Sequence, residues 1–141
     1  MAAFNKFNQF VEDLGLGIHD FRAANDVLRI YLSNAVPSAS LDLVKADLAE
    51  IAAGNGYTAG GADIQNDQSE TGGTLTVTGV DVTYTASGGS IGPFQYVVLY
   101  NDTPAAPLDP LIGWWDYGSA ITLLTGESFT TDFGTSIFTI A

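Results

Sequence analysis

Few side chains in this sequence could take part in catalysis. His19 is the only histidine, so it is the only side chain whose ordinary pKa lies near neutrality. A nucleophilic triad would need His19 together with a serine and an acid. We expect His19 to make a structural hydrogen bond instead, and we predict that the chain is not an enzyme and has no catalytic residues.

Carboxylates suggest two further kinds of chemistry. Asp116 follows Trp114 and Trp115, a combination that could act on or bind a carbohydrate. Alternation along a strand would send the two tryptophans to opposite faces, so only one could form a sugar platform, and packing in a core or an interface is favoured. Residues 63–70 (DIQNDQSE) carry oxygen ligands, but their spacing matches no EF-hand loop. We predict a solvated loop there, no metal site and no cofactor.

Charge and composition limit the classes of partner. The formal net charge is −12, and residues 46–141 contain no Lys or Arg. Such a surface repels phosphate backbones, so nucleic-acid binding is not expected. The sequence has no cysteine, no run of about 18 apolar residues and no secretory signal at its start. These features predict a protein made in a cytosol, without disulfides and without a membrane partner.

The strand predicted over residues 94–101 organises the rest of the chain. Apolar residues occupy both of its faces, which is typical of a strand near the middle of a sheet. One face is predicted to carry Phe94, Tyr96, Val98 and Tyr100. A proline-rich crossing leads to a second strand over 111–117, which carries both tryptophans. We predict that Phe94, Tyr96, Val98 and Trp115 belong to the core.

The remaining segments predict a mainly β fold. Further strands are expected at about 27–32, 74–85 (with a bulge or bend at Gly79), 120–124, 128–133 and 136–140. This spacing predicts a β sandwich, a jelly roll or a barrel in a single domain, residues 1–141. One short α-helix is predicted over about 41–53, with Leu48 on its buried apolar stripe and Gly54 ending it.

The N-terminal residues, 1–20, form a candidate arm. Phe4, Phe7 and Phe10 follow a helical spacing, but an extended segment fits them equally well. They are too apolar for a free tail, so we predict that they dock on a neighbouring subunit, with Trp114 as a further interface residue. The β-rich part lacks the lysines that often guard exposed strand edges, which also favours a covered edge and an oligomer.

Three passages resemble small structural proteins of tailed bacteriophages. The first is Phe10-Val11-Glu12-Asp13-Leu14 with Ile18-His19-Asp20, and the second is residues 50–61 (EIAAGNGYTAGG). The third is residues 85–124, which include ASGGSIGPF and LIGWWDYG. These passages lie between residues 10 and 124, so the resemblance extends over most of the length of the chain. The group that they resemble is the capsid decoration, or cement, proteins.

The resemblance implies a non-enzymatic virion protein with a jelly-roll-like fold. Such a protein is made in the host bacterial cytoplasm, binds the outer surface of the head and bridges subunits of the major capsid protein. We expect it to act as a homodimer, the commonest closed arrangement. A tail-associated virion module and a carbohydrate-binding module remain as alternatives.

Overall fold

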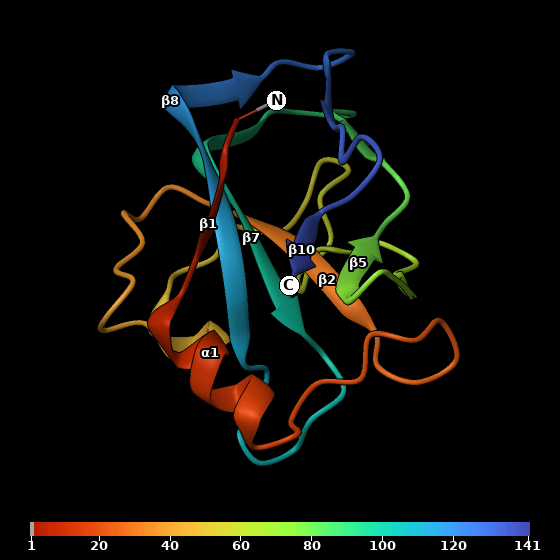
Figure 1. Ribbon diagram of the computed structural model, residues 1–141. Helices are drawn as coiled ribbons and strands as arrows, with labels where there is room; N and C mark the ends of the chain where they lie inside the picture. The colour runs from red at the N-terminus through yellow and green to blue at the C-terminus, as the bar shows by residue number, and fades with distance from the viewer. Residues whose placement is uncertain (1) are drawn as a thin grey trace.

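A computed structural model describes residues 2–141 and shows a mainly β protein, as predicted, with one α-helix at residues 8–15 (Figure 1). Its main layer is a five-stranded antiparallel sheet. The strands of this sheet lie in the order β1 (Phe4–Lys6), β8 (Leu111–Leu123), β7 (Ile91–Asn101), β2 (Leu28–Ser33) and β3 (Ala62–Asp63). A second sheet has the order β10 (Phe138–Ile140), β5 (Thr74–Thr78) and β4 (Asp67–Thr71), and β6 (Val82–Thr85) pairs with β9 (Ser128–Thr131).

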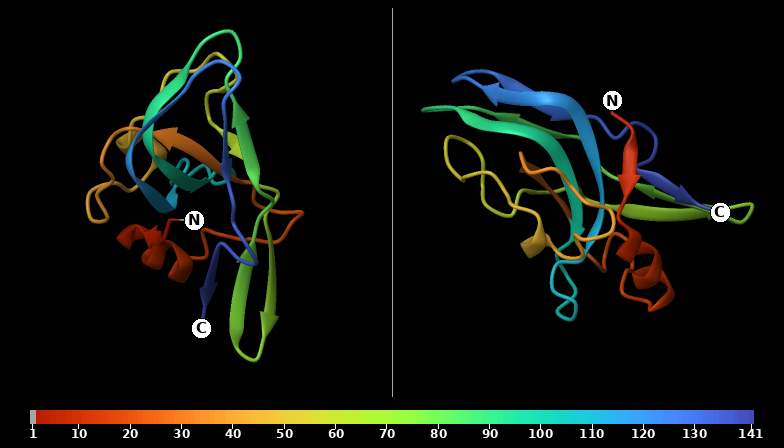
Figure 2. Two further views of the ribbon diagram at one scale, coloured as in Figure 1. Left: turned by 90° about the horizontal axis from the view of Figure 1, so that it is seen from above. Right: turned by 90° about the vertical axis from the view of Figure 1, so that its left-hand side faces the viewer.

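The smaller sheets lie over one face of the main sheet, an arrangement consistent with a β sandwich (Figure 2). The jelly-roll connectivity stays a prediction. The other face of the main sheet is covered by loops and by a short 3₁₀ turn, Lys45–Asp47. The helix α1 (Asn8–Gly15) lies at one end, beside β8.

β7 is the central strand, as its apolar residues predicted. It pairs with β2 on one side and with β8 on the other. Val97 and Leu99 belong to the larger apolar cluster, beneath the small sheets, whereas Tyr96 and Val98 belong to the smaller cluster on the opposite face. All four are buried. The strand therefore holds the two halves of the core together.

The predicted face of Phe94 is wrong. Phe94 is fully buried, but in the larger cluster, together with Val97, and not with Tyr96. The pairing of β7 with β8 shifts between Phe94 and Tyr96, and such an irregularity moves the preceding residues to the other face. Alternation alone could not reveal this shift.

β8 continues through the two separate strands that the sequence predicted, 111–117 and 120–124. Trp114 and Trp115 do point to opposite faces: Trp115 is buried in the larger cluster, and Trp114 packs against the smaller one. Just before them, a Cβ atom at Gly113 would collide with the ring of Phe4. Glycine therefore allows β1 to lie close to β8.

The N-terminal segment is both extended and helical. Phe4 pairs with Trp115 in the β1–β8 ladder, and α1 begins at Asn8. The helix ends in a Schellman motif, because Gly17 has a φ of 71° and donates to the Leu14 carbonyl while Ile18 donates to that of Asp13. The segment thus forms first a strand and then a helix, the two structures that the spacing allowed.

The helix predicted over 41–53 is wrong. Only the 3₁₀ turn forms there, and Leu41 is 76% exposed. The Asp47 carboxylate accepts hydrogen bonds from the amides of Leu43 and Val44, which competes with helix formation. Further along, the segment runs beside β2, where Ile51 donates to the Leu32 carbonyl. Tertiary hydrogen bonds have replaced the helical ones.

The solvated loop predicted over 63–70 is wrong in part, because residues 67–71 form β4 and make a hairpin with β5. β4 and β5 pair in register around Gly72-Gly73, whose φ values of 58° and 84° fit a two-residue hairpin turn. The bend expected at Gly79 is present, because β5 and β6 on either side of it belong to different sheets. The strand predicted over 74–85 is therefore two strands, β5 and β6, which belong to different sheets.

Leu41 and Leu48 allow a direct test of this part of the fold. Leu48 is 3% exposed, so Leu48→Ala should lower the free energy of unfolding by about 2–5 kcal/mol. Leu41→Ala should change it by less than about 0.5 kcal/mol, because Leu41 faces solvent. Denaturant unfolding of both variants measures the difference. Equal losses would show that the two leucines share one buried helix face after all.

Candidate binding surface

Large aliphatic side chains are exposed on two neighbouring loops. Val36 is 77% exposed, Leu41 76% and Leu108 65%, and Leu43 is also exposed. These four residues, named here the apolar loop surface, lie in segments 34–44 and 102–110. Large apolar side chains exposed on adjoining loops are candidates for protein–protein contact.

Backbone hydrogen bonds fix these loops to the sheet and to each other. The Leu111 amide donates to the Leu43 carbonyl over 3.1 Å, and the Lys45 amide donates to Asp109 over 2.9 Å. In the middle of segment 34–44, the Ala39 carbonyl accepts a hydrogen bond over 2.9 Å from the Asn8 amide at the start of α1. The loops therefore present their apolar side chains from a defined backbone, so little ordering would be needed on binding.

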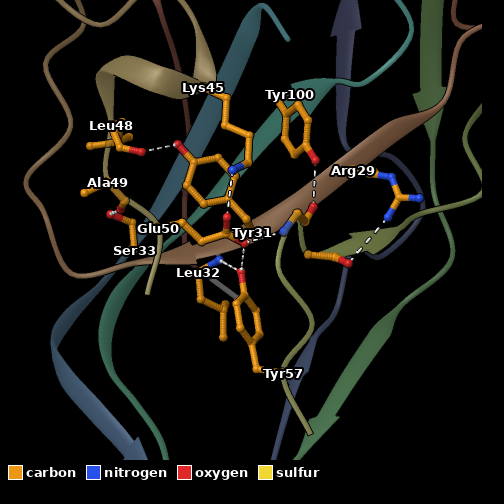
Figure 3. Close-up of polar contacts among 12 residues, drawn as sticks. Arg29, Tyr31, Leu32, Ser33, Lys45, Leu48, Ala49, Glu50, Tyr57 and Tyr100 are labelled. Carbon is orange, nitrogen blue, oxygen red and sulfur yellow. Dashed lines mark hydrogen bonds and ion pairs between the residues drawn. The ribbon is translucent and has the colours of Figure 1, made fainter. Parts of the chain in front are cut away.

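A polar cluster around Glu50 holds the rest of this segment in place (Figure 3). One carboxylate oxygen of Glu50 forms an ion pair with Lys45 Nζ at 2.7 Å. The other accepts hydrogen bonds from Tyr57 Oη and from the Gly60 amide, both at 2.7 Å. The Tyr57 hydroxyl in turn accepts a hydrogen bond from the Leu32 amide of β2. Glu50 thus links segment 45–50 and loop 57–60 to each other and, through Tyr57, to the main sheet.

Tyrosines on β2 and β7 complete this cluster. Tyr31 donates to the Leu48 carbonyl over 2.9 Å, and Tyr100 donates to that of Gly60 over 2.7 Å. Lys45 Nζ lies 4.8 Å from the centre of the Tyr31 ring, within cation–π range. Burial, with a smaller effect of the Glu50 charge, raises the pKa of the Tyr31 hydroxyl, which therefore stays a hydrogen-bond donor. The cluster is structural support for the exposed loops.

The N-terminal phenylalanines do not form a free docking arm. Phe7 and Phe10 are buried in the two clusters of their own chain, so the interface prediction is wrong for both. Phe4 is half-buried and packs edge-on against Trp115, with ring centres 5.3 Å apart. Trp114 is half-buried too, and its ring lies 4.6 Å from that of Phe7. The spacing of these residues reflected packing within the chain.

His19 makes the structural hydrogen bond that was expected of it. Its Nδ1 lies 3.0 Å from Nδ2 of the buried Asn101, which also donates to Asp26. The ring stacks on Phe21, with centres 5.5 Å apart. Burial lowers the pKa of His19, and the nearby charges of Asp13 and Asp26 oppose this effect. His19 thus anchors the end of β7 to the segment that follows α1.

Ser90 lies in a glycine-framed pattern that the sequence-based prediction of catalytic residues did not include. Residues 88–92 (GGSIG) have the spacing of a nucleophile elbow, which requires a strand before the serine and a helix after it. Here β7 follows Ser90 directly. His19 contacts Asn101 at the far end of this 11-residue strand, which spans roughly 30 Å at ~3.3 Å per residue. The structure therefore does not bring Ser90 and His19 together.

The candidate carboxylates are occupied by local hydrogen bonds. Asp116 accepts from Gln95 Nε2 at 3.0 Å and from the Gly118 amide, and these bonds lower its pKa. Asp63 accepts from the Gln65 amide, and Glu70 from the Gly73 amide. Within residues 2–141, no group of three or more His, Cys, Asp or Glu side chains is placed to hold a metal ion.

Comparisons with known proteins add no family to this picture. No protein-family model, curated protein or solved structure matches the chain. None of the helices formed by residues 2–141 is long and apolar enough to cross a membrane.

The Glu50 cluster should be a main source of stability for the covering loops. Glu50→Ala would leave three donors without their acceptor, so we expect a loss of about 2–3 kcal/mol in the free energy of unfolding. Arg22→Ala, which breaks the exposed ion pair with Asp20, is the control and should have little effect. Similar small losses for both variants, measured by denaturant unfolding, would contradict the structural role of Glu50.

His19 should make stability depend on pH below its ordinary pKa of 6.5. Because its pKa is lower in the folded protein, the unfolded chain binds the proton more readily, and the free energy of unfolding should fall as pH drops from about 7.5 to about 5. His19→Gln keeps a polar side chain but removes this titration. The wild type should therefore lose more stability than the variant over this range. Parallel pH profiles of the two proteins would rule out the effect.

Proposed function

We propose that this protein is a capsid decoration protein, which binds the outer surface of a bacteriophage head and stabilises the shell without catalysis. The observation that carries the proposal is the apolar loop surface, in which Val36, Leu41 and Leu108 are more than half exposed on loops with a fixed backbone. Rigid apolar anchors of this kind suit a site that docks on another protein. The sequence resemblance supplies the identity of the partner, the major capsid protein.

The distribution of charge supports docking on a surface of opposite sign. The protein carries a net charge of −12, and three of its four basic side chains are neutralised in ion pairs: Arg22, Arg29 and Lys45. Basic patches on the shell would attract such a molecule and speed its association. The same charge opposes non-specific aggregation of the free protein.

Stabilisation of the shell would follow from linkage. A protein that binds only the assembled lattice lowers the free energy of that lattice relative to its free subunits. Each copy that contacts two shell subunits, whether alone or as a homodimer, gains from avidity. A modest affinity at each contact is then sufficient for the virion.

Carbohydrate binding has less support. A sugar platform needs an exposed aromatic face, whereas Trp114 packs on Phe7 and Trp115 is 1% exposed. We therefore place contact with a partner on the loops and not on the tryptophans.

The proposal predicts that Leu41→Glu weakens binding to purified undecorated heads, measured by co-sedimentation. A carboxylate in place of Leu41 would have to lose its hydration inside an apolar contact, so we expect at least about a tenfold loss of affinity. Leu124→Glu is the matched control, because Leu124 is also exposed (60%) but lies outside the two loops. Failure of the wild type to bind heads would refute the function. Equal binding by the two variants would refute the surface.

A further inference from the structure

The small sheet has an open edge along β4. Within residues 2–141, β4 pairs with β5 alone, so the other side of β4 has no neighbouring strand. Four of its five residues are exposed, and the hairpin that it forms with β5 projects beyond the rest of the molecule in both views of Figure 2. Residues 46–141 contain no lysine, the residue that often guards such an edge. The edge is therefore accessible to another extended strand.

The hairpin turn shows which residues of β4 bond to β5. Thr71 and Thr74 flank a two-residue turn, so they form a hydrogen-bonded pair. Hydrogen-bonded pairs recur at every second residue of an antiparallel ladder, which assigns the backbone groups of Ser69 to β5 as well. Gln68 and Glu70, on either side of Ser69, therefore direct their amides and carbonyls outward.

Two contacts agree with this direction. The Ile137 amide donates to the Val77 carbonyl over 2.8 Å, so Val77, the residue opposite Gln68, directs its backbone groups to β10 and not to β4. The Gln68 amide donates over 2.8 Å to the carboxylate of its neighbour Asp67. A local side chain thus satisfies an amide to which β5 offers no acceptor.

The order of residues along β4 is complementary to a second copy of itself that runs antiparallel. With Ser69 opposite Ser69 of the other copy, Gln68 lies opposite Glu70, and Asp67 lies opposite Thr71. Each pair joins a carboxylate with an amide or hydroxyl donor, and such cross-strand pairs stabilise a sheet. The two Gln68–Glu70 pairs also exchange backbone hydrogen bonds, two in each pair. A register centred on Glu70 would instead place two carboxylates opposite each other.

We propose that the protein forms a two-fold dimer through β4, in which two three-stranded sheets join into one continuous sheet centred on Ser69. One carboxylate oxygen of Glu70 accepts from the Gly73 amide, which leaves the other oxygen for Gln68 of the second copy. The inference does not depend on the proposed function, although a dimer with two apolar loop surfaces could bridge two shell subunits. The net charge of −12 on each copy opposes association, so the dimer should become tighter as salt screens this repulsion.

Two cysteine variants provide a matched test, because the chain has no cysteine of its own. Ser69 and Thr71 are both exposed and lie on the same face of β4. In the proposed dimer, the two Ser69 residues form a non-hydrogen-bonded pair with Cα atoms about 4.5 Å apart, within the range of a disulfide. Each Thr71 lies opposite Asp67, so the two Thr71 residues are roughly 14 Å apart and cannot be bridged.

Under mild oxidation, Ser69→Cys should therefore form a disulfide-linked dimer at least about tenfold faster than Thr71→Cys, because only its thiols face each other. Non-reducing electrophoresis measures both rates. Equal rates would contradict the proposed register. A faster reaction of Thr71→Cys would do the same.

Sedimentation velocity tests the dimer without a disulfide. The free wild type should show a reversible monomer–dimer equilibrium that shifts toward dimer at higher salt. Gln68→Pro removes an outward amide and leaves the ladder to β5 intact, so this variant should fold, as circular dichroism would confirm, and remain a monomer. A wild type that stays monomeric up to about 1 mM would overturn the proposal, as would a Gln68→Pro variant that still dimerises. If that variant does not fold, the comparison of the two cysteine variants decides. None of these results depends on binding to heads, so the proposed function is tested separately.

Discussion

The burial of β7 on both of its faces is the constraint on which the rest of this structure depends. A strand in this position needs a hydrogen-bonded neighbour on each side and an apolar layer above and below. β2 and β8 supply the neighbours, and the two apolar clusters supply the layers. The two layers are built differently, and this asymmetry connects the fold with the proposed function.

One layer is made of strands and the other mainly of loops. Strands satisfy their own backbone groups by pairing, whereas a loop packed on a sheet needs other partners for its amides and carbonyls. Tyr31 and Ser33 of β2 donate to carbonyls of the covering segment, and Glu50 accepts from Tyr57 and Gly60. These bonds explain how a segment with almost no regular secondary structure stays ordered over the smaller cluster. They also allow it to turn leucine and valine side chains outward.

The loop layer thus supplies the feature of this molecule that suits contact with another protein. The apolar loop surface offers side chains that would enter a pocket on a partner. Copies bound side by side on a lattice would gain from avidity, so a modest affinity at each contact would be sufficient.

The sequence by itself determined the elements whose burial follows from the pattern of neighbouring residues. Apolar residues on both faces of 94–101 predicted the central strand, and the adjacent tryptophans were correctly assigned to opposite faces of β8. The mainly β class and the bend at Gly79 also followed from local patterns. Leu48, Phe94, Tyr96, Val98 and Trp115 are all buried, as predicted. In each case the alternation of side chains or the conformation of glycine acts over a few residues, so a local pattern is sufficient.

Tertiary structure decided the rest. Segment 41–53 has a helical apolar stripe, but the Asp47 carboxylate and the edges of β2 and β8 offered its backbone better partners than a helix did. Phe7 and Phe10 have the composition of a docking arm, yet each found a place in the core of its own chain. The apolar loop surface depends on which segments far apart in the sequence meet, as when Leu43 bonds to Leu111. No local pattern carries that information, because burial and edge pairing are properties of the whole packed chain.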